Sequence, residues 1–277
     1  MLANSPEIHP TSGAVGAEIL GIDLAEPLPE TTIGLIRRTL ADRGVVFFRD
    51  QALTPDQHIA LARRFGVINV NRFFAHHAEH PEIALVTKEP DQTRNIGGGW
   101  HTDHSYDQEP AMGSMLYARE VPPAGGDTLF ASMYAAYDAL SDGLKATLAG
   151  LRAVHSSRHV FGQMRPGLEG RIGNPHLATQ DAVHPVVITH PDSGRKALFV
   201  NPGFTLRFDG WTDDESRALL SYLYQHGQRP EFATRFVWRK GSMAFWDNRA
   251  TWHLAVNDYH GQRREMHRIT IEGCALN

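Results

Sequence analysis

Short segments typical of β-strands follow one another through the second half of the chain, and few helical segments separate them. The candidate strands cover residues 114–119, 128–133, 185–190, 196–201, 234–240, 242–246 and 267–272. A doubly wound parallel sheet needs a helix between successive strands, so this order disfavours it. We expect a mixed α/β fold with a mainly β core, built as a double-stranded β-helix (jelly roll) with surrounding helices.

The first third of the chain carries the clearest helix signals. Apolar residues at helical spacing predict a helix over 30–43 that Gly44 ends, followed by a buried strand over 45–48. Thr54 and Gln57 have the spacing of a capping box, which marks the start of a second helix.

We expect the second helix to run to Gly66. A second capping box, with Thr212 and Glu215, predicts a helix late in the chain. No Gly/Ser-rich linker or internal repeat divides the sequence, so we expect a single domain over residues 1–277.

Composition excludes several classes of protein. The 27 Lys and Arg residues against 31 Asp and Glu residues give a net charge of −4, which offers no basic surface for nucleic acid or for an anionic membrane. No apolar stretch approaches the roughly 20 residues of a membrane helix, and no signal peptide is evident at the start. A single cysteine, Cys274, excludes an internal disulfide. We expect a cytoplasmic protein with neither nucleic acid nor membrane as partner.

Sixteen histidines direct attention to metal ligands, and the strongest candidates are His101 and Asp103. On an extended backbone, side chains two residues apart point to the same side, so this pair could bind one ion. His253 is the best third candidate. Two histidines and one carboxylate form the ligand set of non-haem Fe(II) oxygenases. The His-x-Asp pattern alone is also compatible with a solvated strand or a local hydrogen bond.

Two arginines follow His253 and share one face if the chain is extended there. These are Arg264 and Arg268, and on a strand facing the interior both guanidinium groups would enter the cavity that holds the metal. Buried guanidinium groups need anionic partners, and their planar fork suits a carboxylate or a sulfonate. The alternative is a solvated face, where most arginines lie.

Four motifs occur in order: WHTDHSY (100–106), PPAGGDTLFASM (122–133), WDNRATWH (246–253) and QRREMHRITI (262–271). Together with segments near the N-terminus, they make almost the whole chain resemble the taurine dioxygenase-type Fe(II)/2-oxoglutarate-dependent dioxygenases. The resemblance implies hydroxylation of a substrate by O2, coupled to oxidative decarboxylation of 2-oxoglutarate to succinate and CO2.

The resemblance also implies roles for individual residues. His101, Asp103 and His253 match the iron ligands, which are the catalytic centre of the family. Thr128 and Arg264 match the groups that hold the distal carboxylate of 2-oxoglutarate. Arg268 matches the arginine near the other end of the cosubstrate, which also anchors the anionic head of the primary substrate.

The substrate pocket implied by the resemblance has both shared and altered positions. Phe161 and Phe204 align with its aromatic walls. Asn71 and Phe74 stand where the taurine enzymes have a histidine that contacts the sulfonate and a tyrosine that lines the pocket. Gly97 replaces a polar side chain before the iron motif. These departures question taurine as the substrate but leave the class of reaction unchanged.

The sequence thus predicts a dioxygenase that hydroxylates a small organic anion, namely a sulfonate, a sulfate ester or a carboxylate such as an aryloxyalkanoate. The first alternative is taurine dioxygenase itself. A zinc hydrolase with the same ligands is less favoured because it leaves Arg264 and Thr128 unexplained. A metal-free binding module is less favoured because all three ligands and both arginines are present. The identity of the substrate, the pathway and the existence of a homo-oligomer stay open.

Overall fold

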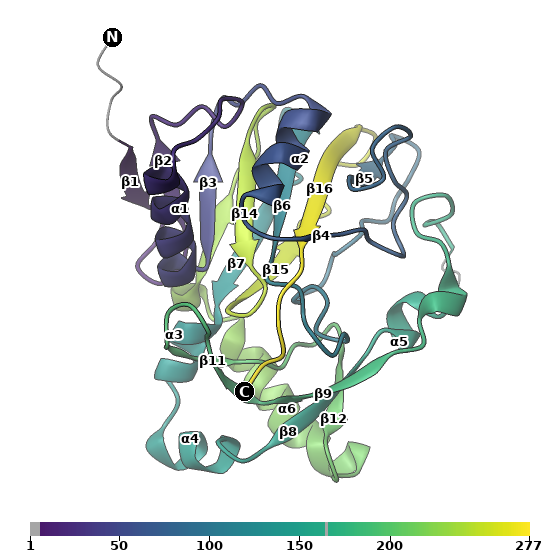
Figure 1. The fold of residues 1–277 in the computed structure, drawn as a ribbon. Helices are drawn as coiled ribbons and strands as arrows, with labels where there is room; N and C mark the ends of the chain where they lie inside the picture. Colours follow the sequence, from purple (N-terminus) through teal and green to yellow (C-terminus); the bar gives the residue numbers. More distant parts are fainter. Residues whose placement is uncertain (1–5, 164–165) are drawn as a thin grey trace.

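The computed structural model describes residues 6–163 and 166–277, which form a mixed α/β fold that is mainly β (Figure 1). The strands are β1 (Glu7–Pro10), β2 (Ala17–Leu20), β3 (Val45–Phe48), β4 (Ile68–Asn69), β5 (Ala84–Lys88), β6 (Gly113–Glu120), β7 (Thr128–Ser132), β8 (Arg152–Ser156), β9 (Asp181–Pro185), β10 (Val187–Thr189), β11 (Lys196–Leu198), β12 (Thr205–Phe208), β13 (Ala233–Phe236), β14 (Met243–Asp247), β15 (Thr251–Ala255) and β16 (Arg264–Ile271). The helices are α1 (Glu30–Arg43), α2 (Pro55–Arg63), α3 (Met133–Asp138), α4 (Asp142–Leu148), α5 (Arg158–Phe161) and α6 (Asp213–Gly227), with short 3-10 turns at Pro175–Leu177 and Pro230–Phe232.

Most strands belong to two sheets that pack face to face. The large sheet has the order β1-β2-β3-β14-β6-β16-β4, with β5 also paired to β16, and the small sheet has the order β13-β7-β15. Aromatic rings join them: Phe47 of β3 stacks on Phe236 of β13 with centroids 4.1 Å apart, and Trp246 of β14 lies 5.7 Å from Phe130 of β7. These rings belong to an apolar layer between the two sheets. The site described below lies next to this layer.

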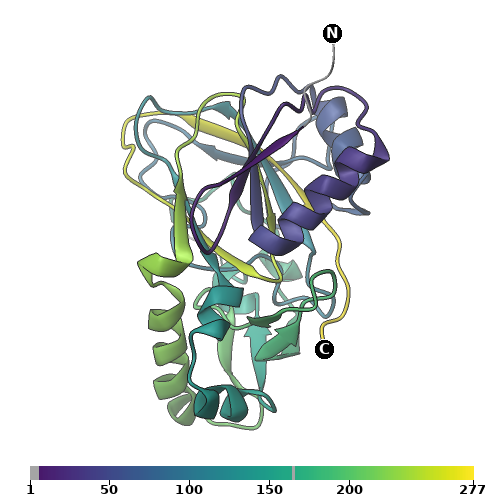
Figure 2. The same cartoon turned by 90° about the vertical axis from the view of Figure 1, so that its left-hand side faces the viewer.

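Helices α1 and α2 cover the outer face of the large sheet (Figure 2). Helix α1 ends as predicted at Gly44, which has a φ of +74° and donates its N–H to the carbonyl of Leu40. The capping box of α2 is present at Thr54 and Gln57. The predicted end of α2 at Gly66 is wrong, because the N–H groups of Arg64 and Phe65 turn back to carbonyls only three residues earlier.

The remaining elements form a second layer of structure around α6, at the end of the molecule opposite the N-terminus (Figure 1, Figure 2). Helix α6 begins with the predicted capping box of Thr212 and Glu215. The predicted strand over 185–190 is divided, since β9 ends at Pro185 and β10 begins at Val187. Strands β12, β8 and β9 form one small sheet here, and β10 and β11 form another.

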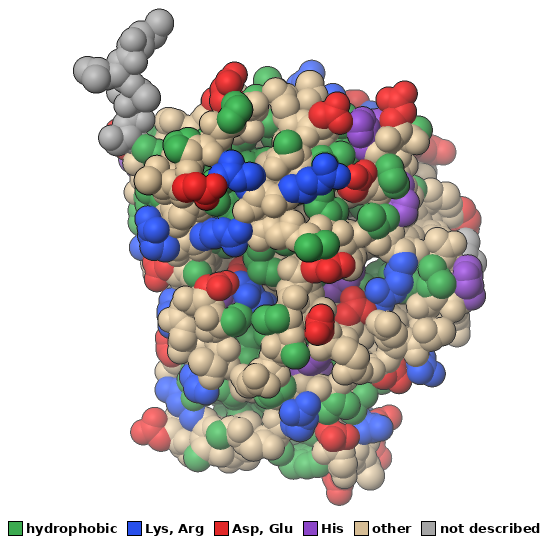
Figure 3. Space-filling model, in the orientation of Figure 1, with side chains coloured by type: hydrophobic (Ala, Val, Ile, Leu, Met, Phe, Trp, Pro, Cys, Tyr) green, Lys and Arg blue, Asp and Glu red, His purple; other side chains and the backbone are tan. Residues whose placement is uncertain are grey.

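Charged side chains of both signs are interspersed over the face drawn in Figure 3, in keeping with the nearly balanced composition. Among the described residues, every helix is too short or too polar to cross a membrane.

Candidate active site

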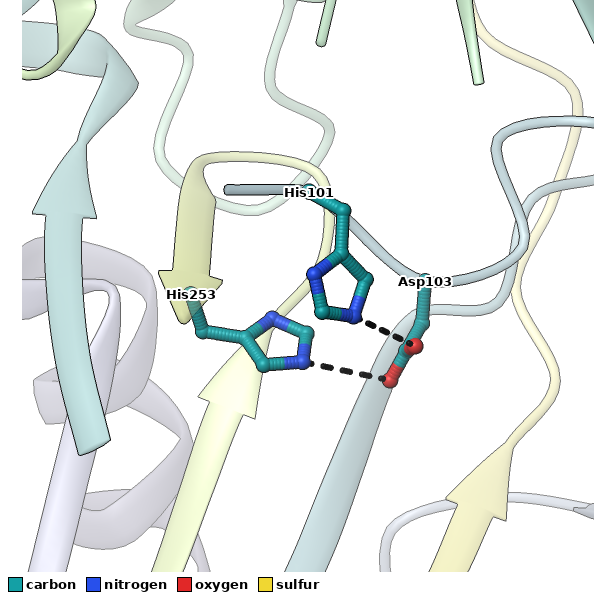
Figure 4. Close-up of side chains that lie close together, drawn as sticks. All are labelled: His101, Asp103 and His253. Atoms are coloured by element: carbon teal, nitrogen blue, oxygen red, sulfur yellow. Dashed lines mark ion pairs between the residues drawn. The ribbon is translucent and has the colours of Figure 1, made fainter. Parts of the chain in front are cut away.

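Three predicted metal ligands converge between the two sheets (Figure 4). His253 lies on β15, and His101 pairs with it through two backbone hydrogen bonds, from His101 N to His253 O (3.1 Å) and from His253 N to His101 O (2.8 Å). The expected extended segment ends there, because the chain turns at Asp103 instead of continuing as a strand. The turn still brings the carboxylate to the two imidazoles.

The side-chain geometry of this triad fits a facial metal site. Nε2 of His101 lies 3.7 Å from Oδ1 of Asp103, and Nε2 of His253 lies 3.9 Å from Oδ2. Nδ1 of His101 donates to the carbonyl of Gly99 at 2.8 Å, which leaves the lone pair of Nε2 directed toward the carboxylate. Burial holds the pKa of His253 well below 6.5, so its imidazole is neutral as a ligand must be.

Asp103 is kept ionised by its surroundings. Burial alone raises the pKa of a carboxyl group, but the guanidinium of Arg268 and the neighbouring imidazoles outweigh burial and hold the pKa of Asp103 below its usual value. Nη1 of Arg268 lies 3.4 Å from Oδ2, and the hydroxyl of Ser114 donates to the same oxygen at 3.2 Å. The carboxylate is therefore fixed in orientation before any ion binds.

A cavity of about 430 Å³ opens onto the triad, and its two ends differ in chemistry. One end is cationic at Arg264, which lines the cavity from the same strand, β16, as Arg268, as the sequence predicted. The other end is aromatic and contains three predicted pocket residues, Phe74, Phe161 and Phe204. Arg268 lies between the ends, with its guanidinium 4.2 Å from the centroid of the Phe74 ring.

At the cationic end, Arg264 lacks an anionic partner. It is 3 % exposed, and its Nε and Nη2 atoms have no hydrogen-bond partner among the described residues. Burial lowers the pKa of Arg264, so the charge is maintained at a cost in free energy. Buried unpaired donors beside a cavity fit a ligand carboxylate.

The predicted partner of Arg264 also lines the cavity. Thr128 accepts a hydrogen bond at its Oγ1 from Nε1 of Trp238, at 2.9 Å. An indole N–H only donates, so the hydroxyl hydrogen of Thr128 remains available for an acceptor in the cavity. No sequence pattern indicated a role for Trp238, which contacts Thr128 because β13 pairs with β7.

Asn71 is the predicted pocket residue that the structure places outside the cavity wall. Its Oδ1 accepts from the backbone N–H groups of Phe73 and Phe74, at 2.9 and 3.1 Å, and its Nδ2 lies 3.3 Å from Nε2 of His104. The side chain is 3 % exposed, and its polar atoms are engaged within the protein. The contact of Asn71 with substrate stays a prediction, and in this structure Asn71 orients the turn that presents Phe74 to the cavity.

A second group of potential ligands lies outside this cavity, at His190, Asp192 and Asp247. Nδ1 of His190 accepts from the backbone N–H groups of Asp192 and Ser193, and its Nε2 lies 3.0 Å from Asp247. Arg249 pairs with both carboxylates, at 2.5 and 2.6 Å. The lone pairs that a metal needs are already engaged, so this group is an ion-pair network.

Comparison with known proteins places this fold and site in one class. The family model described as "Taurine catabolism dioxygenase TauD, TfdA family" matches residues 7–270. An alpha-ketoglutarate-dependent 2,4-dichlorophenoxyacetate dioxygenase from Cupriavidus pinatubonensis is 38% identical over 282 residues, covering 95% of this chain and 95% of the relative. An alpha-ketoglutarate-dependent sulfate ester dioxygenase from Pseudomonas putida is 32% identical over 283 residues, covering 96% and 89%.

A solved structure, "AAD-2 in complex with Mn(II) and N-oxalylglycine", superimposes with a TM-score of 0.82 at 27% identity, covering 99% of each chain. Fold, site and relatives define a dioxygenase that depends on 2-oxoglutarate, also called alpha-ketoglutarate. The chain belongs to the TauD, TfdA family.

Proposed function

We propose that this enzyme binds Fe(II) at His101, Asp103 and His253 and uses 2-oxoglutarate and O2 to hydroxylate a small organic anion with an apolar tail. The observation that carries this proposal is the set of groups that line one cavity: the unpaired Arg264, the triad, and Arg268, which contacts both Asp103 and the Phe74 ring of the aromatic wall. The two packed sheets support a jelly-roll core around that cavity.

Each residue has a distinct task in this proposal. Bound Fe(II) supplies the activation of O2, as in other enzymes with two histidines and one carboxylate. Arg264 and Thr128 bind the distal carboxylate of 2-oxoglutarate and so fix which end of the cosubstrate meets the triad. Arg268 holds Asp103 in place and presents its charge to the anionic head of the substrate. The aromatic wall excludes water from the reacting carbon.

Three aromatic rings favour an apolar tail over an amino group. Phe74, Phe161 and Phe204 are each less than 9 % exposed and stand within one aromatic cluster. They offer no carboxylate to an ammonium group, and burial of an unpaired charge is costly. The names of the relatives, which act on sulfate esters and on 2,4-dichlorophenoxyacetate, support the same class of substrate.

We expect hexyl sulfate, hexanesulfonate or phenoxyacetate to outperform taurine by at least about tenfold in kcat/KM. Each buried methylene contributes about 0.8 kcal/mol, so a longer tail that fills the aromatic wall reaches this factor. The measurement is the rate of substrate-dependent succinate formation with each anion supplied alone, compared with the rate for taurine supplied alone. A higher kcat/KM for taurine than for all three anions would favour the alternative that the enzyme is a taurine dioxygenase. Product formation without 2-oxoglutarate would indicate the hydrolase alternative.

The Arg268→Ala variant extends this panel. We expect it to remove the preference for anions over neutral analogues of the same tail. Because Arg268 also contacts Asp103, metal affinity is measured on the same preparation, and the comparison is made at saturating metal.

The hydrogen bond from Trp238 to Thr128 gives a further prediction about cosubstrate binding. We expect Trp238→Phe to weaken 2-oxoglutarate binding about three- to tenfold, because Thr128 loses the donor that orients its hydroxyl. Calorimetry on Trp238→Phe, Thr128→Val and the double variant checks this. In the Thr128→Val background, Trp238→Phe should cause no further loss of affinity for 2-oxoglutarate. Additive losses of affinity in the double variant would show that the two side chains act independently.

Three further expectations remain predictions. The chain is proposed to act as a single domain over residues 1–277. The cytoplasmic location expected from the sequence and the absence of nucleic-acid and membrane partners are proposed on composition alone. Size-exclusion chromatography with light scattering will determine whether a homo-oligomer forms.

A further inference from the structure

Tyr106 follows the metal ligand Asp103 by three residues and lines the cavity at its aromatic end. The side chain is 2 % exposed. Its ring lies at right angles to Phe204, with centroids 4.8 Å apart, and at 6.0 Å from Phe161. On another side, the guanidinium of Arg72 lies 5.2 Å from the ring centroid. Packing therefore fixes the ring within the wall that contacts a bound tail.

The hydroxyl of Tyr106 forms no hydrogen bond to any residue in 6–163 or 166–277. Tyrosine hydroxyl groups that are removed from bulk solvent normally find a partner. The other buried tyrosine hydroxyls among the described residues follow this rule: Tyr117 donates to the carbonyl of Gln51, Tyr134 to the carbonyl of Ala41, and Tyr259 to Oδ1 of Asn95. Tyr106 thus lines the cavity and has a hydroxyl without a hydrogen-bond partner among the described residues.

Ring contacts link Tyr106 both to the metal site and to Arg268. Phe204 touches both Tyr106 and the metal ligand His101, whose ring centroid is 6.2 Å from that of Phe204. Phe161 touches both Tyr106 and Phe74, and Phe74 lies under Arg268. Tyr106 is therefore one ring away from the metal site and two rings away from the arginine that is proposed to bind the anion.

The protonation state of Tyr106 makes it a hydrogen-bond donor. Burial raises its pKa far above the ordinary value, and the carboxylates of Asp107 and Asp103 act in the same direction. Arg72 and Arg268 oppose this shift without reversing it. At neutral pH the group is a neutral hydroxyl that seeks an acceptor.

We propose that Tyr106 is a specificity-determining residue that donates a hydrogen bond to an oxygen linking the anionic head of the substrate to its apolar tail. Such an oxygen is the bridging atom of a sulfate ester or the ether oxygen of an aryloxyalkanoate. A methylene at the same position leaves the hydroxyl buried without a partner, and sites of this kind discriminate strongly against analogues that lack the polar atom. The inference rests on the proposed function and narrows it to substrates whose tail is attached through oxygen.

Two matched pairs of anions test this inference, each with oxygen replaced by methylene. They are hexyl sulfate against heptane-1-sulfonate, and phenoxyacetate against 3-phenylpropanoate. Calorimetry without O2, on enzyme loaded with Mn(II) and 2-oxoglutarate, measures binding separately from turnover. We expect the wild-type enzyme to bind the oxygen member about three- to tenfold more tightly in the pair it accepts.

The variant Tyr106→Phe should abolish that difference and leave the dissociation constant of the methylene member within about twofold of the wild-type value. Thermal unfolding of the ligand-free variant should be unchanged or shifted upward, because the lost hydroxyl has no partner in the folded protein. Tyr222→Phe is the matched control, since this tyrosine is 50 % exposed and does not line the cavity, and it should retain the wild-type preference.

Four results would overturn the inference, and they are distinguishable. Equal binding of both members by the wild-type enzyme, or a Tyr106→Phe variant that binds both members with wild-type affinities, overturns it while the proposed function stands. Equal weakening of both members in Tyr106→Phe shows that the hydroxyl binds the anionic head instead of the linking oxygen. A wild-type enzyme that binds 2-oxoglutarate but none of the four anions overturns the proposed substrate class as well.

Discussion

Asp103→Ala should lower the affinity for Fe(II) by more than about 100-fold, measured by anaerobic calorimetry. Changes in groups that only support a metal ligand commonly reduce affinity about 10- to 100-fold, and loss of the ligand itself exceeds this range. Asp103 supplies the negative charge of the triad and lies within 3.9 Å of both histidine Nε2 atoms. Its removal also leaves Arg268 facing the site without a carboxylate, and this cation repels the incoming ion.

Asp192→Ala is the matched control for this experiment. Asp192 belongs to the second group of potential ligands, where Arg249 and the backbone already satisfy the side chains. We expect its replacement to leave the number of bound metal ions and their affinity unchanged. Retention of wild-type affinity in Asp103→Ala, or a loss in Asp192→Ala, would show that the metal site has been assigned to the wrong group.

Arg264→Ala should raise the dissociation constant of 2-oxoglutarate at least tenfold. Loss of one partner of a desolvated charge pair costs about 2–5 kcal/mol, and each 1.4 kcal/mol corresponds to about a tenfold change. Nothing else among the described residues at this end of the cavity carries a guanidinium with two unpaired nitrogens, so no neighbour replaces it. Calorimetry on the metal-loaded protein gives the constant directly.

Three comparisons separate this effect from a general loss of structure. A 2-oxo acid without the distal carboxylate should bind Arg264→Ala and wild type equally. Ligand-free Arg264→Ala should be no less stable in thermal unfolding than wild type, since a buried unpaired charge has been removed. The dissociation constant of 2-oxoglutarate for Arg264→Lys should lie between the values for wild type and Arg264→Ala, because lysine keeps the charge but lacks the planar pair of N–H donors. An unchanged constant for 2-oxoglutarate in Arg264→Ala would exclude this residue as the anchor.

The structural features that the sequence predicted correctly lie in segments whose local conformation is set by neighbouring residues. The strand over 264–271 alternates its side chains, so Arg264 and Arg268 had to share a face once the segment was extended. The helix over 30–43 ends at Gly44 because glycine readily adopts the left-handed conformation found there. The order of four motifs was sufficient to indicate the family.

Asn71 shows why position in a motif does not determine a role. Its alignment with a substrate-binding histidine predicted a contact with substrate, yet its amide is engaged by Phe73, Phe74 and His104. His104 lies 33 residues further along the chain and reaches Asn71 only after the turn at Asp103 has formed. No local pattern around residue 71 contains that information.

The sequence by itself determined the chemistry of the site: two histidines, one aspartate, two arginines and a threonine, in segments whose order indicates the reaction class. Tertiary structure decided which of their donor and acceptor atoms lack a partner within the described part of the protein. Pairing of His101 with His253 directs three ligand atoms to one point, the contact of Trp238 with Thr128 leaves one hydroxyl hydrogen unused, and packing of Tyr106 leaves its hydroxyl unpaired in the cavity. The physical reason is that hydrogen-bond satisfaction depends on contacts between residues distant in sequence, whereas the capacity to donate, accept or carry charge belongs to each residue type.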